Sequence, residues 1–157
     1  MGEPTYTVAR SATVGADADR VFEQIVDFRR WPAWSPWEDV DPNLHRTYSG
    51  APSGVGSVYE WSGNRKAGAG RMAITGAHEP DRVLIDLQFL KPFKSHNTIT
   101  FTLEPQDGGG SRVTWTMTGP RTLTVKMMGM FSSMDKLVGG DFEKGLARLR
   151  AVVETPA

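Results

Sequence analysis

The sequence contains no cysteine among its 157 residues. Disulfide bonds, thiolate metal sites and cysteine nucleophiles are therefore excluded. A chain without disulfides is compatible with a reducing compartment. The first residues, Met1 to Tyr6, lack the basic and apolar regions of a signal peptide. We therefore expect the protein to be cytoplasmic.

The sequence also lacks an excess of charge of either sign. Lys plus Arg and Asp plus Glu both number 18. Nucleic-acid binding without sequence preference needs a positive field, so no nucleic-acid partner is expected. A polybasic membrane anchor is excluded on the same ground. No apolar stretch approaches the roughly 20 residues of a membrane span, so we expect no integral membrane segment.

Catalytic and metal-binding motifs are missing as well. His45, His78 and His96 are far apart and have no metal-like spacing to one another, so neither a metal nor a cofactor is expected. No Gly-x-Ser-x-Gly sequence exists, and we predict no catalytic residue. Gly54 and Gly56 form only Gly-x-Gly between two predicted strands, which indicates a turn rather than a dinucleotide site.

What the sequence does have is a cluster of tryptophans, Trp31, Trp34 and Trp37. Pro32 and Pro36 prevent a regular helix through them. A spacing of three predicts a tight helical turn that presents large rings to one side. Two interpretations stay open: at least two rings fill the core, or one or more line a cavity for an apolar ligand.

The segment before the tryptophans predicts a strand and then a short helix. Residues 5–14 are rich in β-formers and Gly15 ends the run. Asp17 or Asp19 can cap the helix that follows. Its apolar residues lie at helical spacing on one face, and they are Val21, Phe22, Ile25 and Val26.

From residue 45 to residue 120 apolar and polar side chains alternate. This pattern predicts an antiparallel sheet with one packed and one solvated face. Counting the opening strand and a short strand at Leu44–Tyr48, we expect about seven strands. Glu60 and Asp86 fall on the polar phase of their strands. His78 falls on the phase of Met72 and Ile74, at a strand end where exposure is expected.

The last third changes to a helical period. Apolar residues step by three or four positions from Met127 to Val153, which predicts one stripe on a long helix. Gly139 and Gly140 interrupt the stripe, so a kink or a close backbone approach is expected there. The helix must bury its stripe against the packed face of the sheet, and a curved sheet gripping a helix can leave a cavity.

The order of elements predicts a single α+β domain over residues 1–157. A curved antiparallel sheet of about seven strands wraps around a long C-terminal helix, with two short helices after the first strand. Several segments carry a family resemblance: residues 8–14, 19–28, 31–37, 54–61, 70–75 and 140–146. On these segments the chain resembles the SRPBCC superfamily of START-like, birch-pollen-allergen-like helix-grip proteins, and within it the bacterial polyketide cyclase/dehydratase-like group.

The resemblance implies a hydrophobic ligand held between the sheet and the C-terminal helix. We expect the following residues to line that cavity: Trp34, Trp37, Tyr59, Trp61, Met72, Ile74, Leu87, Phe89, Phe101, Trp115, Met127, Phe131, Met134 and Val138. Glu38 and Arg71 are candidate polar anchors, although Arg71 lies on the polar phase of its strand. The methionines between residues 127 and 134 suit an adaptable pocket wall or an ordinary core.

Three functions remain open from the sequence. The first is binding or transport of a lipid, quinone or aromatic polyketide-like molecule, with apolar burial as the driving force. The second is a cyclase or dehydratase in which Arg71, Glu38 or Tyr59 assists proton transfer. The third is a protein-interaction module with an exposed patch at residues 123–131. The sequence does not name the ligand or the oligomeric state.

Overall fold

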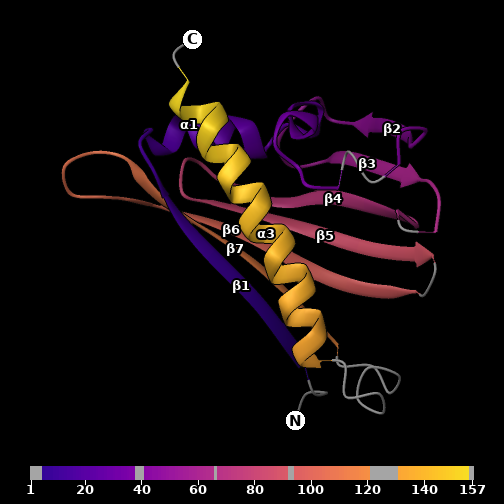
Figure 1. Cartoon of the computed structure of the whole chain (residues 1–157). Coiled ribbons are helices and arrows are strands. Elements are labelled where there is room, and N and C mark those ends of the chain that lie inside the picture. The colour runs from indigo at the N-terminus through magenta and orange to yellow at the C-terminus, as the bar shows by residue number, and fades with distance from the viewer. Residues whose placement is uncertain (1–4, 38–40, 66, 92–93, 121–130, 156–157) are drawn as a thin grey trace.

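The computed structural model describes residues 5–37, 41–65, 67–91, 94–120 and 131–155. Strands and helices follow one another in the predicted order (Figure 1). They are β1 (Thr5–Val14), α1 (Ala18–Ile25), η1 (Phe28–Ala33), β2 (His45–Gly50), β3 (Ser57–Ser62), β4 (Ala69–His78), β5 (Arg82–Lys91), β6 (Ser95–Pro105), β7 (Ser111–Pro120) and α3 (Phe131–Glu154).

The strands form one antiparallel sheet of seven strands in the order β1-β7-β6-β5-β4-β3-β2. Helix α3 crosses one face of this sheet, which we call the inner face, and the C-terminal end of the helix lies beside α1 (Figure 1). It packs mainly on β1, with smaller contacts to α1 and η1. The α+β fold with a long helix gripped by a curved sheet is confirmed.

The tryptophan segment forms the predicted tight turn, the 3-10 helix η1. Trp31 and Trp34 are buried, which confirms that at least two rings belong to the core, whereas Trp37 is 38% exposed. The indole N–H of Trp31 donates to the Ile25 carbonyl at 2.9 Å, and that of Trp34 to the Gln24 carbonyl at 3.3 Å. Both bonds hold η1 against the end of α1.

Asp17 is the N-cap residue of α1, as one of the two predicted positions, but its side chain makes no capping hydrogen bond. The face predicted for this helix is confirmed, because its buried residues include Val21, Phe22 and Ile25. Gly54 and Gly56 lie in the turn between β2 and β3, with φ of +72° and +96°. Positive φ strains residues with a side chain, so glycine suits both positions of this turn.

The alternation in the strands is confirmed except at the two ends of β4, where its pairing with β5 shifts register. A register shift between Ile74 and Gly76 puts Ala77 opposite the buried Val83. His78 then pairs with Arg82 and lies on the outer face, so its predicted phase was wrong. One extra residue in a strand inverts the facing of every residue after it.

Helix α3 is continuous through Gly139 and Gly140. A Cβ at Gly139 would overlap the guanidinium of Arg10, which lies on β1 and pairs with Glu143 at 3.1 Å. The close approach predicted for the glycine pair is therefore made by a side chain. Further along the helix, a Cβ at Gly145 would come within 2.8 Å of the Trp115 ring. Both glycines let α3 lie close to β1 and β7.

Candidate functional site

The inner face divides into a packed part and a partly open part. The packed part is an aromatic cluster next to η1 and α3, formed by Trp31, Trp34, Phe101, Trp115 and Phe142. The Trp115 ring stacks on Phe142 with centroids 4.2 Å apart and planes inclined by 10°. All of these rings are buried, so in this state they fill the space that the sequence assigned to a cavity.

Trp115 carries one unusual feature within this cluster. Trp115 is 1% exposed, and its indole N–H has no hydrogen-bond acceptor among the described residues. A buried donor without an acceptor costs about 1–3 kcal/mol. The cluster is therefore closely packed, but it contains one hydrogen-bond donor that meets no acceptor among the described residues.

The partly open part of the inner face lies on β3, β4 and β5. Trp61, Met72 and Phe89 pack against the core but are only partly buried. Trp61 meets Phe89 edge to face at 5.9 Å and stacks against Tyr59 at 6.0 Å. Gly70 lies between the strands of Trp61 and Phe89, and a Cβ there would overlap the Trp61 ring. Trp61, Met72 and Phe89 together form an apolar surface, which we call the aromatic row.

A buried polar group lies at one end of this surface. The phenol of Tyr6 donates to Asn97 Oδ1, and Asn97 Nδ2 donates to Ser95 Oγ at 3.1 Å. The register places Asn97 opposite Leu87 and Ser95 opposite Phe89. Burial raises the pKa of Tyr6 to about 12. Tyr6, Asn97 and Ser95 are therefore a neutral hydrogen-bonded group beside the aromatic row, and we call them the polar group.

Gly119 makes the polar group possible. It pairs with Tyr6 across β1 and β7, and a Cβ at this position would come 2.9 Å from the Tyr6 hydroxyl and overlap Asn97. Sequence reasoning missed all of these residues. The alternation could have indicated all of them, because Tyr6 shares the phase of Val8, Ser95 and Asn97 share that of Ile99, and Gly119 shares that of Met117.

The structure places the predicted site residues in four groups. Trp34, Ile74, Phe101 and Trp115 belong to the packed core. Leu87 and Tyr59 are buried next to the aromatic row, which contains Trp61, Met72 and Phe89. Trp37 and Val138 lie at the α3 side, partly exposed. Glu38 and Met127 lie outside the described residues, and the side chains of Phe131 and Met134 are not described.

Arg71 lies on the outer face. In the strand register it lies opposite Glu60 on β3 and opposite Gln88 on β5. These three residues belong to the polar phase of their strands. On the same face His96 Nε2 and Asp86 Oδ1 are hydrogen-bonded. Since Arg71 points away from α3, we do not include it among the residues of the proposed site.

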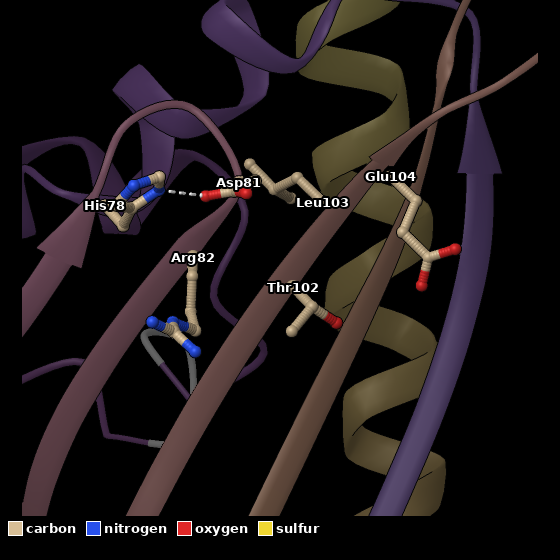
Figure 2. A pocket seen from close by; sticks show the side chains of 6 residues that line it. All are labelled: His78, Asp81, Arg82, Thr102, Leu103 and Glu104. Carbon is tan, nitrogen blue, oxygen red and sulfur yellow. Dashed lines mark hydrogen bonds and ion pairs between the residues drawn. The ribbon is translucent and has the colours of Figure 1, made fainter.

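The outer face also carries a shallow pocket of about 330 Å³ (Figure 2). Its lining residues are His78, Asp81, Arg82, Thr102, Leu103 and Glu104. His78 Nδ1 and Asp81 Oδ1 are 2.6 Å apart, and this hydrogen bond holds the pKa of Asp81 below its usual value. The pocket is open, and five of its six lining residues are polar or charged, which does not suit an apolar ligand.

Within the described ranges, no group of three or more His, Cys, Asp or Glu side chains could hold a metal ion. Among the described helices, none is long and apolar enough to cross a membrane.

Comparison with known proteins agrees with the sheet and helix described above. A model of the family described as "Polyketide cyclase / dehydrase and lipid transport" matches residues 5–154. The chain is a helix-grip protein of the SRPBCC type and belongs to this family. A search of the curated proteins found no match.

Solved structures share the fold at low sequence identity. Protein CV1439 from Chromobacterium violaceum is 15% identical with a TM-score of 0.68, over 96% of this chain and 99% of that one. The di-domain ARO/CYC protein StfQ from the steffimycin biosynthetic pathway is 10% identical with a TM-score of 0.73, over 96% of this chain and 51% of that one. Ara h 8.0201 is 16% identical with a TM-score of 0.62, over 96% and 98%.

Proposed function

We propose that this protein binds a small hydrophobic molecule on the aromatic row of its inner face, as a carrier or sensor. Partial exposure of Trp61, Met72 and Phe89 carries this proposal. They lie on the face that the rest of the sheet buries, so three large apolar side chains retain surface that a ligand could cover. Covering apolar surface stabilises a complex by roughly 25 cal/mol per Å².

The character of the row supports an aromatic or ring-containing ligand. Trp61 and Phe89 already meet edge to face, and Tyr59 stacks on Trp61. Aromatic rings favour such offset and perpendicular contacts over parallel sandwiches, so a further ring can add to the array. Met72 lies on β4 opposite Tyr59, and its flexible side chain can repack around ligands of different shape. Lipids, quinones and aromatic polyketide-like molecules are the classes that fit.

The comparisons support two of these classes, lipids and polyketide-like molecules. The family description names both lipid transport and polyketide cyclases, and StfQ is described as an ARO/CYC protein of a biosynthetic pathway. A cyclase or dehydratase reaction would need a titratable group beside the aromatic row. Of the predicted candidates for proton transfer, Tyr59 lies there and Arg71 lies on the outer face. The partly exposed apolar side chains support binding directly, so we propose binding and assign no reaction.

A pair of neighbouring substitutions on β5 tests the proposed site. Phe89 faces inward and is partly buried, whereas its neighbour Leu90 is 47% exposed. We expect Phe89→Ala to weaken binding of the neutral fluorescent probe N-phenylnaphthylamine by about tenfold, because a buried ring contact of roughly 1.5 kcal/mol is lost. Leu90→Ala should leave the dissociation constant unchanged.

Fluorescence titration of the three proteins measures these constants, and circular dichroism confirms that each variant is folded. An equal loss of affinity in both variants would contradict the proposed site. So would a lack of saturable binding to the unaltered protein. Native mass spectrometry of the protein as purified, followed by extraction, identifies the class of any molecule that it carries.

A further inference from the structure

The polar group at the end of the aromatic row is positioned to choose among hydrophobic ligands. Asn97 is 2% exposed, and its amide holds two N–H donors and one carbonyl acceptor. Tyr6 donates to the carbonyl and one N–H donates to Ser95. Among the described residues, no acceptor meets the second N–H. A buried polar donor is normally satisfied, and a ligand oxygen is an acceptor that would satisfy this N–H.

The register places this donor within reach of a molecule on the aromatic row. Asn97 lies opposite Leu87, Leu87 lies opposite Met72, and Ser95 lies opposite Phe89. Neighbouring strands are about 4.8 Å apart, so a ring covering Phe89 and Met72 ends one or two strand spacings from the backbone of Asn97. A ligand with a short polar substituent can therefore contact the row and the amide together.

The charge of the polar group decides to what kind of ligand oxygen the Asn97 N–H can donate. Tyr6, Asn97 and Ser95 are all neutral, and the raised pKa of Tyr6 keeps its phenol protonated in ordinary buffers. On the described strands, the charged positions of the inner face are distant or paired. Arg10 pairs with Glu143, and Arg46 lies on β2, four strands and about 19 Å from β6. Lys94, next to Ser95, is exposed.

We propose that Asn97, held by Tyr6 and Ser95, is the specificity-determining anchor of the ligand site and selects a neutral carbonyl or hydroxyl oxygen over a carboxylate. The inference rests on the proposed function. A carboxylate buried here would lose its hydration and would meet no cation among the described strand positions, which disfavours fatty acids and other anionic ligands. A ketone, quinone or alcohol gains a hydrogen bond at smaller cost.

Three naphthalenes of similar size test the anchor: acetylnaphthalene with a neutral carbonyl, naphthoate with a carboxylate, and ethylnaphthalene without oxygen. We expect isothermal titration calorimetry to show acetylnaphthalene binding about 3- to 10-fold tighter than ethylnaphthalene, the contribution of one hydrogen bond, and naphthoate binding weakest. Asn97→Leu should abolish the preference for acetylnaphthalene while ethylnaphthalene still binds. Thr98→Ala, on the outer face of the same strand, should leave the preference unchanged.

The possible failures are distinct. Binding of all three compounds with equal affinity, or strongest binding of naphthoate, would overturn the anchor and leave the proposed function intact. Failure of all three to bind would overturn both. Because Asn97→Leu also removes the partner of the Tyr6 hydroxyl, Ser95→Ala provides a second variant at the edge of the group. It should leave the fold intact. Because Ser95 holds the Asn97 amide, the affinity for acetylnaphthalene relative to ethylnaphthalene should fall.

Discussion

At the residue scale, Tyr6 shows how a buried polar side chain is kept in one protonation state. Its hydroxyl is withdrawn from water and donates to Asn97. Burial disfavours the phenolate and raises the pKa from 10.0 to about 12. Below pH 10 the phenol is neutral in both the folded and the unfolded chain. Between pH 10 and 12 the unfolded chain loses this proton first, so folded stability falls as the pH rises.

Tyr6 should therefore titrate apart from a normal tyrosine. The chain has three tyrosines, and we expect ultraviolet absorbance to show one phenol ionising near pH 12 or only on unfolding. Tyr6→Phe should remove that phase. It should also make stability less sensitive to pH between 10 and 12, measured by urea unfolding. A late phase that persists in Tyr6→Phe would assign the buried phenol elsewhere.

At the scale of elements, two adjacent glycines in α3 have opposite surroundings. Around Gly140 a Cβ would meet no atom within 4 Å, whereas at Gly139 it would overlap the Arg10 guanidinium. Arg10 also donates to Glu143 on the helix and to the Ala9 carbonyl on its own strand. Gly139 therefore belongs to the contact between α3 and β1, and Gly140 does not.

Alanine substitutions should separate these roles. Gly140→Ala should raise the free energy of unfolding by up to about 1 kcal/mol, because alanine favours the helix more than glycine does. Gly139→Ala gains the same propensity but displaces Arg10 from its partners, so the net gain should be smaller or negative. Thermal unfolding of the two variants measures the difference. An equal rise in both would show that Arg10 moves aside at no cost.

At the scale of the whole molecule, η1 closes the packed end of the grip. Trp34 contacts Trp31 within η1, Phe101 on β6 and Trp115 on β7, so one side chain joins the loop after α1 to the sheet. Trp37, six residues after Trp31, also contacts Trp115 but remains partly exposed. The two tryptophans differ in how much of the fold depends on them.

We expect Trp34→Ala to lower the free energy of unfolding by about 3–5 kcal/mol, the usual cost of removing a large buried ring. Trp37→Ala should cost clearly less, because this ring is 38% exposed and has less burial to lose. Urea unfolding followed by circular dichroism compares them. Similar losses in the two variants would mean that η1 is not the closing element.

Much of the fold follows from local patterns. The period-two runs predicted β3 to β7 and their buried phases, and the stripe at helical spacing predicted α3. The error at His78 arose because a register shift between Ile74 and Gly76 leaves no mark in the alternation before it. Of the site, the apolar members Trp61, Met72 and Phe89 were predicted, whereas Arg71 was placed by the register on the outer face.

The sequence by itself determined which side chains share a face, because that depends only on the period of the backbone. It could not determine which inner-face rings α3 and η1 would cover, since that depends on where the helix crosses the sheet. Nor could it bring Tyr6 to Asn97, which are 91 positions apart and meet only through the order of β1, β7 and β6. Tertiary structure decided both, because strand order and helix placement are set by packing of the whole chain.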